Sequence, residues 1–499
     1  MPMMDIAPPS RSLDEIMDLI PVGRYHYMLL ILAGLAFASD AMEVNILYFT
    51  SHCAAVEWNL TSAEEASIIS VVFGGQLIGN LFWGIISDMK GRRKTFLAAF
   101  WIIAIAGFLS GLSPTYGVLL VLRFIVGFGI GGSPIPFDLL AELLPRAMRG
   151  KYLVYIEFWW TFGTIFVTGL AWLILSSSGW RTLIYVTAAP VTLSCIISYF
   201  YLPESPRWLL TKGRVKEAET VLKNIATVNN VKLPPFKLSI NGGSRGNQID
   251  SYITESVGCI ETIRTECGSI LEMVGNKKIQ KIVCPLMVVW MVFGFTYNGL
   301  IFFSGRLYTS DDDNNSCSFD YFSIFINATG EICGVILAIY LIDYQGRSRS
   351  QYMLYTASAI AVVFIGISQS KNSLLVIAII ARVFIMAASC ATWVATPELL
   401  VTEIRSTGHA VCNALARVAA FTAPYMILSN LNNTKCGIIL ATFNLIGAIA
   451  AFMLPETGDQ YLDSVYQIDH RSSFSINNSR IQKSDEAITS PILPIDRRS

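Results

Sequence analysis

Long apolar segments alternate with short polar ones along most of the chain. A helix that crosses a bilayer needs about 20 mostly apolar residues, and twelve segments meet that requirement. They run at 27–50, 65–87, 95–112, 117–139, 152–175, 182–202, 280–303, 320–342, 352–369, 373–396, 408–428 and 435–454. The pattern therefore predicts an all-α membrane protein with twelve transmembrane helices.

Three pairs of motifs recur at nearly the same separation, 255, 256 and 252 residues. The pairs are "GIISDMKGRRK" (84–94) with "IYLIDYQGRSR" (339–349), "ELLPRAMRG" (142–150) with "ELLVTEIRS" (398–406), and "LPESP" (202–206) with "LPETG" (454–458). One separation shared by three motifs indicates an internal duplication of six helices. We therefore expect two six-helix repeats.

Basic residues gather in the loops that follow the even-numbered segments, for example "KGRRK" (90–94), "PRAMRGK" (145–151) and "GRSRS" (346–350). The loop at 51–67, after the first segment, has no Lys or Arg. Since basic loops mark the cytosolic side of a membrane protein, both termini are predicted to lie in the cytosol.

The predicted topology divides the chain into five parts. We expect a cytosolic N-terminal segment at 1–26, a first six-helix half at 27–202, a cytosolic connector at 203–279, a second half at 280–455 and a cytosolic tail at 456–499.

Three Asn-x-Ser/Thr sites fall in the outside loops of this topology, at Asn59, Asn314 and Asn432. Such sites accept N-linked glycans where they face the lumen or the exterior. We therefore expect a glycosylated, multi-pass protein of the plasma membrane or of a cytoplasmic vesicle membrane.

The composition excludes several classes of function. The residues are 53% hydrophobic and only 14% charged, against roughly 25% charged in soluble domains. The formal net charge is zero, which gives no electrostatic basis for binding nucleic acid. The ten cysteines form no Cys-x-x-Cys motif, so neither a metal site nor a disulfide framework is expected. No phosphate-binding loop or catalytic constellation is present, so we expect no enzyme and no cofactor.

Charged residues inside the apolar segments are the main functional candidates, because each costs about 2.5–3.5 kcal/mol or more at the bilayer centre. Three acidic and three basic residues qualify, and oppositely charged partners from the two halves are expected to neutralise one another. These residues are Asp40, Glu43, Arg123, Glu331, Arg382 and Arg417.

Asp40 and Glu43 are three residues apart, so they lie on one face of the first helix. Together they could form a binding site for a proton or for an organic cation, or they could serve only to pair with an arginine. Glu331 lies near the middle of its segment, where its side chain is farthest from water, and is expected to bind substrate or a proton, with a structural salt bridge as the alternative. Arg123, Arg382 and Arg417 either have structural roles or contact an anionic substrate, and for Arg417 the structural role is favoured.

Aromatic and amide side chains within the segments suggest a pocket. We expect Tyr297 and Asn298, in "TYNG" (296–299), to line a binding site. Trp159 and Trp160 lie close together in the fifth segment, and a tryptophan pair of this kind is typical of an anchor at the membrane interface.

Several motifs resemble those of the major facilitator superfamily. "GIISDMKGRRK" resembles its loop between the second and third helices, and "PESPRWL" (203–209) resembles the end of its sixth helix. The opening "SLDEIMDLIPVGRYHYMLLILAGLAFASDAMEVNIL", the segment "DYFSIFINATGEICGVILAIYLIDYQGR" and "RVAAFTAPY" (417–425) resemble the synaptic-vesicle-two-related branch.

This resemblance implies a secondary active transporter that moves a small organic ion by alternating access, with a proton as a candidate coupling ion and a monomer as the functional unit. The alternative is a membrane scaffold that keeps the transporter fold without transporting. In this superfamily, paired acidic and basic residues at the cytosolic loops latch one conformation. The corresponding gating residues here are Gly84, Asp88, Gly91, Arg92, Arg93, Glu142, Arg149, Asp343, Gly346, Arg347, Glu398 and Arg405.

Within these motifs, Gly84 and Gly91 are expected to permit tight packing and a sharp turn. Glu142 with Arg149, and Glu398 with Arg405, are expected to form matching ion pairs. In the second half, "GRSRS" (346–350) replaces the family's "GRRK"-like run.

Overall fold

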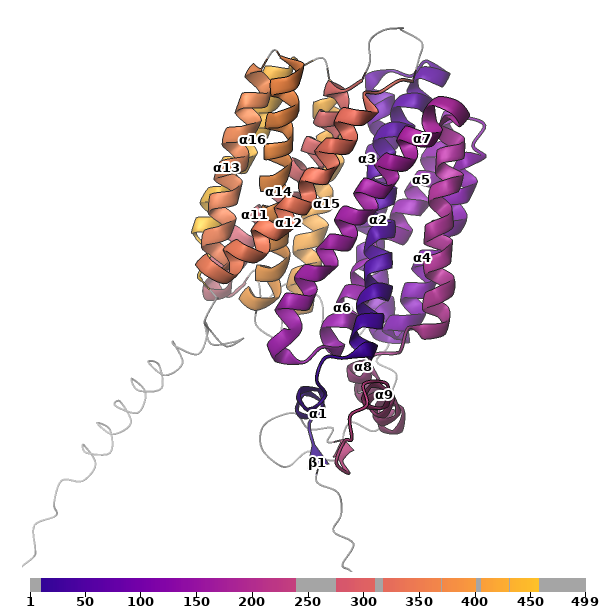
Figure 1. The fold of residues 1–499 in the computed structure, drawn as a ribbon, viewed down its shortest axis with the longest axis vertical. Coiled ribbons are helices and arrows are strands. Elements are labelled where there is room, and N and C mark those ends of the chain that lie inside the picture. Colours follow the sequence, from indigo (N-terminus) through magenta and orange to yellow (C-terminus); the bar gives the residue numbers. More distant parts are fainter. Residues whose placement is uncertain are drawn as a thin grey trace, which may run out of the picture.

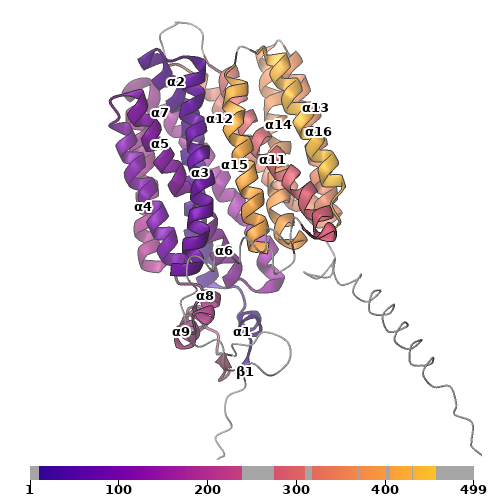
Figure 2. The ribbon, with the colours of Figure 1, turned by 180° about the vertical axis from the view of Figure 1, so that it is seen from behind.

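A computed structural model describes residues 10–238, 275–309, 317–368, 370–400, 405–429 and 431–456. Two helical bundles stand side by side, and a small group of elements lies at one end of the first bundle (Figures 1 and 2). We call the end of the molecule where this group lies the connector end.

The first bundle consists of α2 (Arg24–Trp58), α3 (Ser62–Lys90), α4 (Arg92–Gly111), α5 (Tyr116–Ile130), α6 (Pro134–Leu143) and α7 (Arg146–Tyr201). Helix α7 has 56 residues and contains a non-helical Gly179 with φ 76°. A straight helix of that length would measure about 84 Å, far more than the roughly 30 Å of the apolar membrane core. Gly179 therefore divides α7 into two crossings.

The second bundle consists of α11 (Lys277–Leu307), α12 (Tyr321–Gln345), α13 (Arg347–Ile367), α14 (Lys371–Leu399), α15 (Arg405–Ile427) and α16 (Asn433–Phe452). Within the described residues, eleven helical stretches are long and apolar enough to cross a membrane, and one of them contains the Gly179 break. The predicted twelve-helix membrane fold is confirmed.

One predicted segment differs from the structure in detail. The fourth segment, at 117–139, was expected as one helix, but the structure interrupts it between α5 and α6, at Gly131–Ser133. Pro134 and Pro136 follow directly, and a proline lacks the backbone N–H that would continue the helical ladder. The interruption places Ser133 in the interior of the molecule.

The small elements at the connector end are α1 (Leu13–Leu19), α8 (Pro206–Thr211), α9 (Val215–Val228) and the paired strands β1 (Ser10–Arg11) and β2 (Lys237–Leu238). Asp14 of α1 forms an ion pair with Arg207 of α8. The Asn229 side chain, next to α9, accepts a hydrogen bond from the backbone N–H of Tyr25 at 2.9 Å. These contacts hold the N-terminal segment and the start of the connector beneath the first bundle.

Glycines allow corresponding helix pairs to pack closely in the two bundles. A Cβ atom on Gly163 of α7 would lie 2.3 Å from the carbonyl oxygen of Ala38 in α2. A Cβ atom on Gly294 of α11 would lie 2.1 Å from the carbonyl oxygen of Ala416 in α15. Both distances exclude a larger residue, and small residues at helix contacts are typical of membrane bundles.

The bundles meet along two pairs of helices, α3 with α15 and α7 with α12. At the first contact, the Ser70 hydroxyl donates a hydrogen bond to the carbonyl oxygen of Phe421 at 2.8 Å. At the same contact, the hydroxyls of Ser67 and Tyr425 lie 3.0 Å apart.

A disulfide joins Cys53 of α2 to Cys317, which precedes α12, at the end of the molecule opposite the connector end. We call this end the disulfide end. Nearby, the Tyr48 hydroxyl lies 2.8 Å from that of Thr309, and the Phe319 ring packs on Tyr48. The expectation of no disulfide was wrong, because cysteine spacing along a chain does not reveal which loops meet 264 residues apart.

This bridge can be tested with Cys53→Ser. Non-reducing digestion of the native chain is expected to yield Cys53 and Cys317 in one linked peptide. Loss of the bridge should lower the free energy of unfolding by about 2–4 kcal/mol, measured as a lower thermal midpoint. Cys284→Ser is the matched control, because Cys284 is an exposed free thiol. Unlinked peptides, or equal midpoints for the two variants, would contradict the bridge.

Candidate functional site

The two bundles enclose a cavity of about 40 Å³ between them. This volume holds about three water molecules, so the space between the halves is small in this conformation. Its walls come from α2, α6, α7, α11, α14 and α15, and thus from both halves. They are formed by Phe37, Asp40, Ser133, Pro134, Glu157, Trp160, Phe293, Gly294, Tyr297, Asn298, Ser389, Trp393, Ala416 and Arg417.

Asp40 reaches the cavity from the first half and Arg417 from the second. The Ser133 hydroxyl donates a hydrogen bond to Asp40 Oδ2 at 2.8 Å. Asp40 Oδ1 and Arg417 Nε are buried and have no hydrogen-bond partner among the described residues. The two opposite charges therefore act on each other across the cavity and leave atoms free to meet a ligand or water.

Glu43 lies one turn beyond Asp40 and pairs with Arg123 of α5, with 3.2 Å between Nη1 and Oε2. Both side chains are almost fully buried, Arg123 being only 1% exposed. Burial of this kind is tolerable only for a paired charge. Both partners belong to the first half, so Glu43 and Asp40 have separate partners despite sharing a helical face.

Glu331 of α12 pairs with Arg382 of α14, with 2.6 Å between Nη2 and Oε1. The Tyr297 hydroxyl donates to the same carboxylate oxygen at 2.8 Å, and Trp160 Nε1 donates to the Tyr297 hydroxyl at 2.5 Å. Because Trp160 belongs to the first half, this chain of hydrogen bonds connects the halves beside the cavity.

The structure corrects the expected neutralisation across the halves. Glu43 with Arg123 and Glu331 with Arg382 each lie within one half. Among the six predicted charges, whose surroundings are known for the described residues, Asp40 and Arg417 face the cavity from different halves. The physical reason is that helices within one half pack side by side along their length, so their long charged side chains can reach one another.

Glu157 of α7 is a buried charge that the sequence reasoning missed. It is 4% exposed, lines the cavity and has an Oε1 atom without a hydrogen-bond partner in the described part of the chain. The available signal was an acidic residue within the fifth apolar segment, near its beginning. The expected interfacial anchor was also wrong for Trp160, which lines the cavity, while Trp159 packs against Gly34.

A second, smaller cavity lies toward the disulfide end, with Asn45, Thr164, Asn327 and Arg382 among its lining residues. Tyr48 closes over it and packs tightly on Gly305, where a Cβ atom would lie 2.3 Å from the ring. The disulfide end is thus closed by aromatic packing as well as by the covalent bridge.

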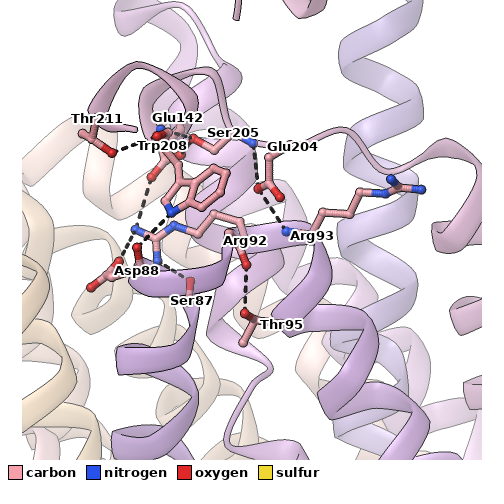
Figure 3. A network of polar contacts seen from close by, with 11 residues as sticks. Ser87, Asp88, Arg92, Arg93, Thr95, Glu142, Glu204, Ser205, Trp208 and Thr211 are labelled. Carbon is pink, nitrogen blue, oxygen red and sulfur yellow. Dashed lines mark hydrogen bonds and ion pairs between the residues drawn. The ribbon is translucent and has the colours of Figure 1, made fainter. Parts of the chain in front are cut away.

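Charged networks occupy the connector end of each half, and Figure 3 shows that of the first half. Arg92 lies 3.4 Å from Asp88 and 3.5 Å from Glu142, and it donates to the Ser87 hydroxyl at 2.8 Å. The Ser205 hydroxyl donates to Glu142 as well. Arg92 therefore joins the ends of α3, α4 and α6 to the start of the connector.

Glu204 from "LPESP" accepts a hydrogen bond from the backbone N–H of Arg93 at 3.2 Å (Figure 3). Glu456 from "LPETG" does the same for Arg347 at 2.6 Å. Each glutamate thus caps the first turn of a helix, α4 or α13, that has no capping side chain of its own. This explains why the motif occurs in both halves.

In the second half, Arg347 donates to both carboxylate oxygens of Glu398, at 2.8 and 3.1 Å. The run "GRSRS" therefore still supplies an arginine for an ion pair at the connector end, here a bidentate one. Asp343 is exposed. The side chains of Arg149 and Arg405, the expected partners of Glu142 and Glu398, lie outside the described residues.

Three glycines of the gating motifs differ in their surroundings. Gly91 and Gly346 adopt φ values of 102° and 86°, which favour glycine, at the turns before α4 and α13. Gly84 was expected to allow tight packing, but a Cβ atom there would meet nothing within 4 Å. That expectation was wrong, because this face of α3 contacts no other described helix at Gly84.

The expected glycosylation sites lie at the disulfide end where they are described. Asn59 follows α2, and Asn432 caps α16. Asn314 lies outside the described residues.

Comparison with known proteins adds to this geometry. A family model described as sugar (and other) transporter matches residues 27–468. The organic cation/carnitine transporter 7 of Arabidopsis thaliana is 29% identical over 482 residues, 91% of this chain and 96% of that protein. The synaptic vesicle 2-related protein of Rattus norvegicus is 31% identical over 465 residues, 89% of this chain and 80% of that protein.

Among solved structures, the chain is similar to the proton:xylose symporter XylE from E. coli bound to 6-bromo-6-deoxy-D-glucose. The TM-score is 0.67 at 19% identity, and the alignment covers 89% of this chain and 99% of XylE. This likeness agrees with two six-helix halves around a central cavity. The chain belongs to the sugar (and other) transporter family of the major facilitator superfamily, in the branch of the synaptic vesicle 2-related proteins.

Proposed function

We propose that this chain is a secondary active transporter that moves a small organic ion across a membrane by alternating access. The observation that carries the proposal is the central cavity, which both halves line with charged groups that lack full hydrogen bonding. A midplane site between two repeats is the usual position for substrate in this kind of fold.

The substrate is an ion because the cavity contains more charge than a neutral solute requires. Asp40, Glu157 and Arg417 all face it, although each buried charge is costly. A scaffold without transport would be more stable with apolar residues at these positions. The name of the Arabidopsis relative, an organic cation/carnitine transporter, is consistent with an organic ion.

A proton is the proposed coupling ion, and Asp40 is its proposed carrier. Its Oδ1 atom is free to hold a proton while Oδ2 stays bonded to Ser133. Protonation removes the attraction between Asp40 and Arg417, which belong to different halves. The proton state of Asp40 therefore changes the force that holds the halves together at the cavity.

The connector end is proposed to face the cytosol, in the plasma membrane or in a vesicle membrane. The basic loops lie at this end, as the positive-inside rule requires. The opposite end carries the disulfide, which is stable in oxidising surroundings, and the proposed glycosylation sites Asn59 and Asn432. Opening at the disulfide end would pivot around the Cys53–Cys317 bridge.

The networks of Arg92 and Arg347 are proposed to act as gating parts by fixing the connector end of each half. In the described residues, both networks pair groups within one half. They keep the helix ends of each bundle together while the bundles tilt, so that movement is concentrated at the contact between the halves.

Transport is tested with purified protein in liposomes, by uptake of labelled organic cations and organic acids with and without a pH gradient. We expect uptake of at least one such ion by the wild-type chain. We expect Asp40→Asn to lose more than tenfold of the gradient-driven rate while keeping exchange of internal for external substrate. Glu57→Gln, in an ion pair with Arg181 at the disulfide end, is the control and should transport normally.

If no labelled ion moves under either condition, transport is rejected and the scaffold alternative is favoured. If ions move but Asp40→Asn keeps its response to the pH gradient, the proton role of Asp40 is rejected while transport stands.

Tyr297→Phe tests the link between the halves. The substitution keeps the ring but removes the hydroxyl that joins Trp160 to Glu331, a loss of about 1 kcal/mol. The halves should then separate more often, and Cys390, which is buried beside the cavity residue Ser389, should react several-fold faster with N-ethylmaleimide. Tyr340→Phe is the control, because Tyr340 is 66% exposed. If Cys390 reacts at equal rates in both variants, the hydrogen bonds through Tyr297 do not restrain the separation of the halves.

A further inference from the structure

The charges around the central cavity do not balance. Among the described residues, the Glu43–Arg123 pair and the Glu331–Arg382 pair are each neutral within one half. Asp40 and Arg417 oppose each other across the cavity. This leaves one buried carboxylate without a basic counterpart, that of Glu157.

Glu157 faces the cavity rather than a neighbouring helix. It is 4% exposed, and its Oε1 atom has no hydrogen-bond partner within the described part of the chain. The charged group that acts on it most is another carboxylate, that of Glu331, which itself is bound by Arg382. An ionised carboxylate in such a position costs several kcal/mol unless a positive charge approaches it.

The walls near Glu157 are aromatic. Phe37 packs edge to face with Trp160 at 6.4 Å and with Trp393 at 6.3 Å between ring centroids. Phe293 and Tyr297 also line the cavity. Aromatic faces attract cations, and several of them together form the cages that bind quaternary ammonium groups.

We propose that Glu157 selects the charge of the transported ion, and that this ion is an organic cation with an alkylammonium group held between the Glu157 carboxylate and the aromatic walls. The inference rests on the proposed function and names the substrate class of the same cavity. An organic anion would add a negative charge beside Glu157, and a neutral solute would leave its carboxylate uncompensated. The cation supplies the missing charge, while Arg417 remains opposite Asp40.

The cavity is too small for such a cation in this conformation, since it holds about three water molecules. Binding therefore requires the halves to part, and it must be measured on the full chain in lipid. Trp160 and Trp393 line the cavity, so their fluorescence reports occupation directly.

The test compares choline and tetraethylammonium with 3,3-dimethylbutan-1-ol, the uncharged isostere of choline, and with nicotinate as an anion. Binding is followed by tryptophan fluorescence of the wild-type chain in nanodiscs. We expect at least one of the two cations to bind more than tenfold tighter than both the isostere and nicotinate. Glu157→Gln should abolish this preference, Glu157→Asp should retain most of it, and Glu57→Gln should leave it unchanged.

The proposal is overturned if the isostere or nicotinate binds as tightly as the better cation, or if Glu157→Gln keeps the preference. The second result would also arise if Glu157 served only as a proton site. The two variants control for each other, because Glu157→Gln keeps the side-chain volume without the charge, and Glu157→Asp keeps the charge on a side chain one methylene shorter. Liposome uptake distinguishes this inference from the proposed transport function. If only an anion is taken up, the role of Glu157 is rejected but transport is not. If a cation binds selectively but no ion is taken up, transport is rejected and the binding site is retained.

Discussion

A charge in the interior of a membrane protein must be neutralised close by, and this requirement organises the centre of the molecule. The first half neutralises Glu43 with Arg123, and the second neutralises Glu331 with Arg382. Because each pair stays within one bundle, a tilt of either bundle would leave these two pairs intact. It would separate only charges that face each other from different halves, such as Asp40 and Arg417.

Among the described residues, three charged groups that line the central cavity lie outside these ion pairs. Asp40 and Glu157 on one side and Arg417 on the other face a cavity with the space of a few water molecules. Tyr297 connects the halves beside this cavity through Trp160, and the disulfide holds them at one end. The polar atoms that could bind a substrate or a proton therefore also contribute to the attraction between the two halves.

Sequence patterns predicted the parts of this structure that depend on short stretches of chain. Segment length gave the membrane helices, and the repeated motifs gave the two halves. Contacts between distant segments could not be predicted, because helical periodicity shows which face of a helix is polar but not which other helix packs against that face. The pairing of charges within halves and the Cys53–Cys317 bridge were missed for this reason. Glu157 was missed because its aromatic neighbours suggested the membrane interface, whereas the break before Pro134 could have been read from its two prolines.

The movement of two rigid halves is tested most directly by double electron–electron resonance with spin labels introduced as unnatural amino acids, which leaves the disulfide intact. Leu112 and Ile367 are exposed labelling sites at the disulfide end, and Tyr201 and Tyr344 are exposed sites at the connector end. Distances are measured in nanodiscs at two pH values, with and without choline. We expect the two distances to change in opposite directions between conditions. Two fixed distances, or two that change in the same direction, would contradict alternating access by rigid halves.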